Sequence, residues 1–313
     1  MDDDVFTVET AAQVWLRRCE ADGLERSTLK SYREHVILHI LPRLGDRDLS
    51  TMRTRDVHEF RDELLVTLSK SMSKKVLASF KAIVSEAVSR EYIQNDFARA
   101  VKIRISSRDV PRKRIPSKEE LRLLLERCPD KDRALITTAI YTGMRLSELR
   151  GLTWQHVALT RSIIEVRQRA DSWRQIANPK SASGHRDIPL APIVVTELTK
   201  LKARKQAGES DYVFGNGAGN VESGSNIYNR TFKPLMKECG LTNKDGKSVF
   251  SFHALRHGAA SLLIDAGWGP KKVQRFMGHS SINVTFDVYG HLFDDAEEDV
   301  GRMAELQSSL EAA

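Results

Sequence analysis

The chain has little cysteine and no long apolar run. Its 313 residues include three cysteines, Cys19, Cys128 and Cys239, an odd number at distant positions. They fit neither a disulfide framework nor a metal-ligand spacing, which indicates a reducing cytosol. No stretch approaches the roughly 20 apolar residues of a membrane span, and the acidic start MDDDV does not resemble a signal peptide. These absences argue against secreted and membrane classes and predict a cytoplasmic protein.

Two common signatures of phosphate chemistry are also missing. The sequence has no glycine-rich phosphate loop, and no group of acidic residues has metal-ligand spacing. We therefore expect neither a cofactor nor a bound metal. Any chemistry at phosphorus must then come from side chains.

What the chain has in excess is positive charge. The formal net charge is +7 and the sequence pI is about 9.3. The last 22 residues carry seven acidic side chains against one arginine, a net charge of −6, so the other 291 residues hold +13. A body this basic suits a polyanionic partner such as nucleic acid. The length is enough for about two domains.

The N-terminal third is predicted to be helical. Residues 7–93 contain four stretches with apolar side chains at helical spacing, the second of which we expect Pro42 and Gly45 to terminate. Four such helices form a small bundle. A basic segment, VKIRISSRDVPRKR at 101–114, follows it. An isolated charge run of this kind is ordinarily a solvated linker.

The remaining two thirds predict a mainly helical domain with a small antiparallel sheet. Ser117 and Glu120 form a capping box before an apolar run, and further helices are expected near 131–143, 226–239, 253–266 and 270–278. A last short helix from about 281 carries Tyr289. Residues 162–166 read as a strand, and 174–190 as two strands with a turn near 181–184. Lys180 would lie at or next to that turn.

Three motifs bring reactive side chains into this domain. Residues 142–149 read TGMRLSEL, residues 253–257 read HALRH, and MGH at 277–279 is followed by YGH at 289–291. His253 and Arg256 share a helix face because they are three residues apart. Together the motifs supply a base, a phosphate clamp, a second imidazole and a phenol. That inventory fits phosphoryl transfer through a phosphotyrosine bond.

The ordered set resembles the tyrosine recombinase (phage integrase) family. TG-x-R-x-S-E-L is similar to the first box of that family and H-x-x-R-H…G-H…Y to the second. Between them, NPKS at 178–181 and HRDIPL at 185–190 look like the hairpin that carries the family's lysine. The resemblance covers about residues 7–291. The catalytic residues that it implies are Arg145, Lys180, His253, Arg256, His279 and Tyr289.

The resemblance also implies a role for each. Tyr289 would attack phosphorus, Arg145 and Arg256 would bind the non-bridging oxygens, and Lys180 would protonate the leaving 5′-oxygen. His253 would act as an acid or base near the nucleophile, and His279 would donate a hydrogen bond to the phosphate.

Every one of these residues also has an ordinary structural interpretation. A tyrosine on a C-terminal helix is commonly a surface residue, and Arg145 with Glu148 could simply form a helical ion pair. A purely structural interpretation of all six residues would require six independent coincidences. We expect Glu148 to orient Arg145, and structural roles for His257, His291 and Trp268. One departure from the family is Trp154-Gln155-His156, where W-x-D is common.

The implied architecture is a clamp around double-stranded DNA. Residues 1–103 would form the helical core-binding domain, 104–115 a basic linker and 116–313 the catalytic domain, whose tail has Val300, Met303, Leu306 and Leu310 at helical spacing. The tail helix would pack on its own chain or dock on a neighbouring protomer. No separate arm-binding domain is expected before the bundle. The linker residues expected to contact the DNA backbone are Lys102, Arg104, Arg108, Arg112, Lys113 and Arg114.

The function that follows is site-specific DNA recombination, with an integrase of a phage or mobile element as the first interpretation. The protein would act in the bacterial cytoplasm at the nucleoid, with two protomers per attachment site and a tetramer in the synapse. DNA-bending and directionality factors are the expected accessory partners. Three alternatives are an Xer-like resolvase of chromosome or plasmid dimers, a type IB topoisomerase-like enzyme and a sequence-specific DNA-binding protein without activity.

Overall fold

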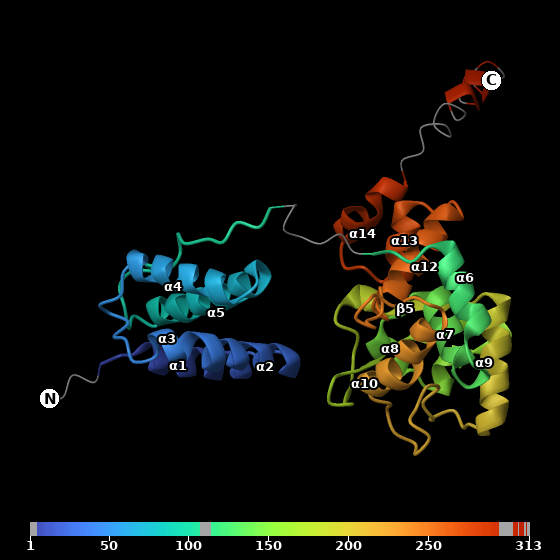
Figure 1. The fold of residues 1–313 in the computed structure, drawn as a ribbon, viewed down its shortest axis with the longest axis horizontal. Coiled ribbons are helices and arrows are strands. Elements are labelled where there is room, and N and C mark those ends of the chain that lie inside the picture. The colour runs from blue at the N-terminus through green and yellow to red at the C-terminus, as the bar shows by residue number, and fades with distance from the viewer. Residues whose placement is uncertain (1–4, 107–113, 294–302, 306, 310, 312–313) are drawn as a thin grey trace. The chain divides into compact units, whose positions relative to one another are not determined.

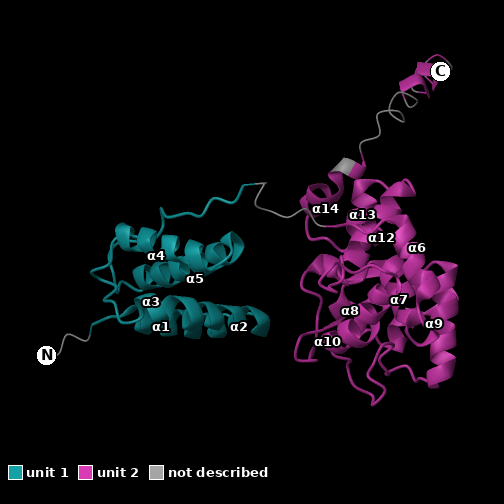
Figure 2. Ribbon diagram, viewed as in Figure 1, with its two compact units in different colours: residues 1–112 teal, residues 113–313 magenta. Residues whose placement is uncertain are grey.

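The computed structural model describes residues 5–106, 114–293, 303–305, 307–309 and 311. The chain divides into two compact units, residues 1–112 and 113–313, which Figure 2 shows in different colours. Each unit has its own hydrophobic core. Of the predicted tail helix, Val300, Leu306 and Leu310 lie outside the described residues, as do Arg108, Arg112 and Lys113 of the predicted linker.

Unit 1 is the predicted helical bundle (Figure 1). Its interior is built from the apolar faces of the helices, with Trp15, Ile40, Phe60 and Phe80 all buried. Serine and threonine side chains cap two of the helices, because Thr7 and Ser69 accept hydrogen bonds from the first-turn amides of α1 and α5. The helices are α1 (Val8–Ala21), α2 (Arg26–His35), the π-helix η1 (Val36–Ile40), α3 (Leu41–Leu44), α4 (Thr54–Thr67) and α5 (Lys70–Ser89).

The second helical stretch continues past Pro42, although the sequence predicted that this proline would help to end it. The amide of Leu41 donates to the carbonyl of Val36, five residues back, in a π turn directly before the proline. Proline lacks an amide donor and crowds the preceding turn, and a π turn is a common way to relieve both problems. The helix ends two residues after Pro42, at Leu44, before Gly45.

The first part of the predicted basic linker packs on unit 1. Val101 and Ile103 are buried in the core of that unit, whereas Lys102 and Arg104 are exposed. Lys81 on α5 donates hydrogen bonds to the carbonyl of Val101 at 3.1 Å and to that of Arg99. The alternation points the two basic side chains to solvent.

Unit 2 is mainly helical. The predicted capping box is present at the start of α6, where Ser117 and Glu120 bond each other's backbone amides at 3.2 and 3.0 Å. The helices are α6 (Lys118–Arg127), α7 (Asp130–Thr142), α8 (Leu146–Gly151), α9 (Pro192–Lys205), α10 (Gly224–Asn226), α11 (Lys233–Glu238), α12 (Ala254–Asp265), α13 (Pro270–Met277) and α14 (Ile282–Tyr289). The short 3-10 and π segments are η3 (Trp154–His156), η4 (Leu159–Arg161), η5 (Ala182–Gly184), η6 (Ile227–Phe232) and η7 (Gly290–Leu292).

Two small antiparallel sheets accompany the helices of unit 2. One has the order β1-β2-β5, with β1 (Val157–Ala158), β2 (Ile163–Val166) and β5 (Arg186–Pro189). The other pairs β3 (Arg169–Ala170) with β4 (Ile176–Ala177). The two strands predicted within 174–190 are therefore present, as β4 and β5, but they lie in different sheets and do not pair with each other.

Helix α9 was not among the predicted elements. Its first residue is Pro192, a common helix-start position, and its apolar side chains Val194, Leu198 and Leu201 are buried in the core shared with α7. No helix in the described part of the chain is long and apolar enough to cross a membrane.

Candidate active site

Arg145 is positioned by a tight turn between α7 and α8. Gly143 ends α7 in the left-handed conformation, at φ +58°, where a Cβ would lie within 3 Å of the Met277 side chain. Arg145 then caps α8: its amide donates to Glu148 at 2.9 Å, and its guanidinium bonds the same carboxylate at 2.8 Å. The guanidinium also donates to the carbonyl of Gly278, just after α13, at 3.0 Å. With 34% of its side chain exposed, Arg145 can meet a ligand.

Glu148 is shared by two arginines. Arg186, on β5, forms a buried ion pair with it at 2.9 Å, and both side chains are at most 6% exposed. Arg186 also donates to the carbonyl of Phe276 at 2.7 Å, which ties β5 to α13. Burial alone would raise the pKa of Glu148, but the charges and hydrogen bonds of Arg186 and Arg145 outweigh burial and lower it to about 2. The expected orienting contact of Glu148 with Arg145 is present.

Arg256 is the buried arginine of the site. It lies in the first turn of α12 and donates to the carbonyl of Gly143 at 2.7 Å and to that of Met277. Burial, followed by the nearby charge of Arg145, lowers its pKa to about 9. Arg145 and Arg186 thus pair with Glu148, and Arg256 lies within the electrostatic reach of the same carboxylate, so the site keeps a net positive charge suited to an anion.

His279 follows α13 and faces the same charges. Its Nδ1 lies 2.9 Å from the hydroxyl of Thr285 on α14, in a buried contact. Burial, then the charges of Arg256 and Arg145, lowers the pKa of His279 to about 3. The imidazole is therefore neutral at physiological pH. A neutral imidazole still has one N–H, so it can donate a hydrogen bond to an anion.

Tyr289, at the end of α14, is the most enclosed of the predicted residues. It is 1% exposed, and its ring is nearly parallel to that of His279, with ring centroids 6.5 Å apart. Its hydroxyl lies 2.6 Å from Nδ1 of His257 on α12. Burial raises the pKa of Tyr289 to about 12, and the charge of Arg256 offsets only part of that rise.

The other two predicted residues lie at the edge of this group. His253 is the N-cap residue of α12, is exposed, and contacts His257 edge to face at 5.2 Å between ring centroids. Lys180 is exposed on the segment between β4 and η5. The hairpin predicted to carry it is instead β3–β4, whose turn lies at 171–175, so Lys180 follows the second strand of that hairpin and does not lie at its turn. The segment approaches the site through Ser183, whose carbonyl oxygen would lie 2.8 Å from a Cβ at Gly278.

The sequence reasoning left two contacting residues out of the site. The motifs assigned no role to Arg186 and predicted a structural role for His257. Arg186 could have been recognised as a second cation of the HRDIPL motif, and His257 as part of HALRH, but neither motif says which partner the side chain meets. The side chain of His291 lies outside the described residues.

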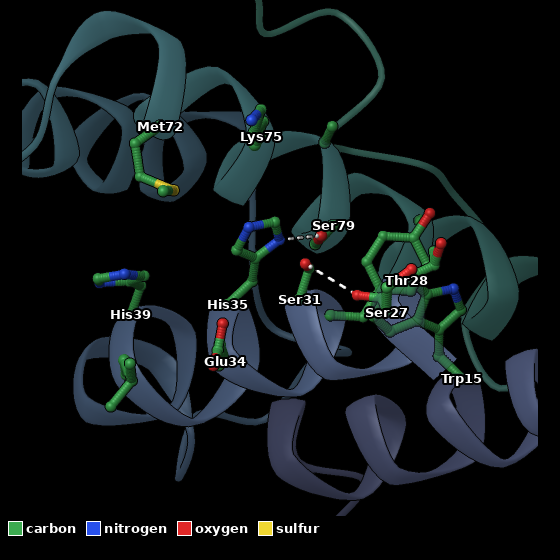
Figure 3. A pocket seen from close by; sticks show the side chains of 14 residues that line it. Trp15, Ser27, Thr28, Ser31, Glu34, His35, His39, Met72, Lys75 and Ser79 are labelled. Atoms are coloured by element: carbon green, nitrogen blue, oxygen red, sulfur yellow. Dashed lines mark hydrogen bonds between the residues drawn. The ribbon is translucent and has the colours of Figure 1, made fainter. Parts of the chain in front are cut away.

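Each unit also has a hollow that could accept a ligand. In unit 1, a hollow of about 630 Å³ lies between α2–η1 and α5, lined by Tyr32, His35, His39 and Lys75 among others. Figure 3 shows Nδ1 of His35 directed at the hydroxyl of Ser79 there, at 2.9 Å. In unit 2, a hollow of about 980 Å³ is lined by several basic side chains and includes Arg186 of the site. Its basic lining residues are Arg167, His185, Arg186, Lys271, Lys272 and Arg275.

Both parts of the chain match models of known protein families. Residues 114–296 match the phage integrase family. Residues 7–65 match the SAM-like N-terminal domain of phage integrases.

Several known proteins are similar to the chain over most of its length. An integrase of Streptomyces ambofaciens is 26% identical over 299 residues, which cover 91% of this chain and 76% of the integrase. The transposase from transposon Tn916 of Enterococcus faecalis is 25% identical over a region that covers 83% of this chain and 69% of the transposase. The tyrosine recombinase XerD of Corynebacterium glutamicum is 25% identical and covers 94% and 97%.

Solved structures show the same fold. The Tn1549 transposon integrase in complex with a circular intermediate DNA has a TM-score of 0.79 at 22% identity, covering 96% of this chain and 99% of that one. A lambda integrase dimer bound to a core site has a TM-score of 0.71 at 18% identity, covering 93% and 96%. A lambda integrase tetramer bound to a Holliday junction has a TM-score of 0.69 at 17% identity, covering 90% and 79%.

Proposed function

Because the chain belongs to the phage integrase family, we propose that its arginine-rich site breaks and rejoins DNA through a covalent bond to Tyr289. The protein is a site-specific tyrosine recombinase, an enzyme that transfers DNA strands. The observation that carries the residue assignment is the position of Tyr289. Although it lies at the end of α14, its ring is nearly parallel to that of His279 and it lies within the electrostatic reach of Arg256.

The two arginines of the motifs bind the scissile phosphate. Arg145 is partly exposed and Arg256 buried, so the first can capture the phosphate and the second can hold it deeper in the pocket. Both remain charged at neutral pH and can bond two phosphoryl oxygens at once. His279, neutral and beside them, donates its remaining N–H to the same group. This arrangement stabilises the charge that develops as phosphorus becomes five-coordinate.

Lys180 protonates the leaving 5′-oxygen. Its exposed segment lies next to Gly278, so a DNA strand in the pocket would run past it. A lysine ammonium can donate a proton to an oxygen on which negative charge develops in the transition state. The 3′-phosphotyrosyl product keeps the energy of the broken phosphodiester, so a 5′-hydroxyl of another strand can attack it without ATP.

The partner is a double-stranded DNA attachment site. Lys102 and Arg104 are exposed where the chain leaves unit 1, and with the basic hollow of unit 2 they provide cations for the phosphates. Arg114 pairs with Glu120 at 2.5 Å, so its contribution to DNA binding would require that pair to open. Two protomers per site and four in the synapse follow by analogy with the lambda integrase tetramer.

The test is trapping of the covalent intermediate. A nicked suicide substrate that carries the element's own attachment site is incubated with protein in EDTA and without ATP. We expect the wild-type protein to form an adduct that survives a denaturing gel, and Tyr289→Phe to bind the site without forming one. Site binding with no adduct from either protein would contradict the proposal and favour a DNA-binding protein without activity.

The relatives favour an integrase of a mobile element, although XerD matches nearly end to end. Recombination between the element's ends and a chromosomal target supports the integrase function. Activity restricted to two copies of one chromosomal site supports dimer resolution. Relaxation of supercoils by a monomer, without site preference, supports a topoisomerase.

A further inference from the structure

His257 makes a direct contact with the reacting oxygen of Tyr289. The distance from Nδ1 to the phenolic oxygen is 2.6 Å, and the two residues are 9% and 1% exposed. The contact joins the first turn of α12 to the end of α14, and both of its side chains are buried. A base must be within about 2.6–3.2 Å of the proton that it removes, and this geometry meets that condition.

The nucleophile needs such a base. With a pKa raised to about 12, Tyr289 would be ionised in roughly one molecule in 10⁴ to 10⁵ at neutral pH. Arg256 contributes only a partial offset, and burial excludes bulk water as the proton acceptor. Attack by the phenol therefore requires a group that removes the proton as the new bond forms.

We infer that His257 is this group, an additional catalytic residue that accepts the proton of Tyr289 during strand cleavage. The Oη–H bond of Tyr289 breaks as its Oη–P bond forms, and the proton passes to Nδ1 of His257. The P–O5′ bond breaks, and the leaving oxygen takes its proton from Lys180. Rejoining reverses both transfers, so His257 returns its proton to Tyr289. The assignment rests on the proposed phosphotyrosine chemistry.

The contacts of His279 and His253 differ from that of His257. The Nδ1 of His279 is hydrogen-bonded to the hydroxyl of Thr285, and its ring lies nearly parallel to that of Tyr289, at an interplanar angle of 10° and with ring centroids 6.5 Å apart. His253 is exposed and contacts the ring of His257 edge to face. We place His253 as a positioning residue for His257.

Several charges bear on the imidazole of His257 and shape its pH response. His253 contacts it edge to face, and the charge of His257 itself contributes to the lowered pKa of His279. The arginine cluster (Arg145, Arg186 and Arg256) disfavours protonation of His257. A bound phosphodiester would reverse that effect by adding negative charge. The base should therefore be most effective with DNA bound.

The experiment uses the full-length protein and His257→Asn. Asparagine places an amide close to the position of Nδ1, so it can keep a hydrogen bond to the phenol but cannot accept its proton. On the suicide substrate, we expect adduct formation to slow by about 10²–10⁴ at pH 7.5. The wild-type rate should level off once the imidazole is neutral, whereas the variant rate should keep rising with pH as the phenol ionises. The matched control is His156→Asn, because Nδ1 of His156 bonds the hydroxyl of Thr153 at 3.0 Å in the same unit.

A second reaction separates catalysis from support of the fold. In a Tyr289→Ala background, a strand ending in a 3′-(4-nitrophenyl phosphate) is joined to a 5′-hydroxyl, and nitrophenolate leaves without needing a proton. Because neither Tyr289 nor its base takes part, adding His257→Asn should leave this rate unchanged. Equal losses in both reactions would make His257 a structural residue, and an unchanged adduct rate and pH profile would also overturn the assignment. No adduct from the wild-type protein would instead refute the proposed function itself.

Discussion

At the residue scale, Glu148 determines how the arginines of the pocket are arranged. It is 2% exposed and bonds both Arg145 and Arg186, so the two guanidinium groups are held apart while sharing one negative charge. Replacing one member of a buried ion pair leaves the charge of its partner without compensation.

We predict that Glu148→Gln destabilises the protein and removes an acid-sensitive part of its stability. The folded-state pKa of Glu148 is depressed to about 2, so its contribution is fully present above the unfolded value near 4.5 and is lost as pH falls toward 2. Loss of the pair should cost about 3–5 kcal/mol at pH 7. Thermal melts from pH 7 to pH 3 should show a steeper decline for wild type than for the variant. Parallel declines would contradict the prediction.

Arg256→Lys tests whether the buried guanidinium acts as a fork and not only as a charge. Lysine keeps the charge but cannot bond the carbonyls of Gly143 and Met277 together with a phosphate. We expect the rate of adduct formation to fall by about 10²–10³, with site affinity nearly unchanged. Single-turnover kinetics and anisotropy titrations measure the two quantities, and equal losses in both would show that the contact acts mainly in binding.

At the element scale, the end of α13 connects three parts of the site. Gly278 has φ +65°, its carbonyl accepts a bond from Arg145, and a Cβ there would lie 2.8 Å from the carbonyl oxygen of Ser183. A backbone oxygen cannot move aside as a flexible side chain would.

Gly278→Ala should therefore reduce both stability and cleavage. Gly267→Ala is a matched control, because Gly267 ends α12 at φ +78° with nothing within 4 Å of a Cβ. The control should lose only the cost of a left-handed alanine, about 1–2 kcal/mol. The Gly278 variant should lose more, together with most adduct formation, and similar behaviour of the two variants would argue against the close contact.

The hollow between α2–η1 and α5 gives a second prediction at this scale. Lys75 lines it and Lys74, one residue earlier, does not, although both are exposed on α5. If the hollow meets DNA phosphates, Lys75→Ala should weaken binding and reduce the slope of log affinity against log salt by about 1. Lys74→Ala should leave the slope nearly unchanged. Identical slopes for the two variants would exclude this hollow as a phosphate contact.

At the scale of the whole molecule, the two units have separate cores. No residue belongs to both hydrophobic clusters, and the described chain between them, through Ile105, packs on unit 1. We predict that residues 1–112 and 113–313, expressed separately, each unfold cooperatively in circular dichroism. Unit 2 alone should bind the site about 10²–10⁴ times more weakly than the full chain. In the full chain, binding of one unit makes binding of the linked second unit intramolecular. Failure of either fragment to fold would show that the units depend on each other.

Features that depend on near neighbours along the chain were predictable from the amino-acid sequence alone. The capping box at Ser117, the helix ends at Gly143, Gly267 and Gly278, and the ordered motifs of a phage integrase are all short-range patterns. Apolar spacing likewise predicted the bundle of unit 1. Two helices were not predicted correctly from local patterns. The second helix continues past Pro42 through a π turn, and α9 was not predicted although Pro192 marks its start.

Which side chains meet in the site depends on how distant segments pack in the folded chain. Arg186 pairs with Glu148 across 38 positions, and His257 reaches Tyr289 across 32. The β4 and β5 strands, predicted as neighbours, pair with other strands and leave Lys180 beyond its hairpin. Motifs identify residue types, but hydrogen bonds depend on distances of about 3 Å between atoms. Packing of α12 against α14, and of β5 against α13, sets those distances, and local sequence does not encode them.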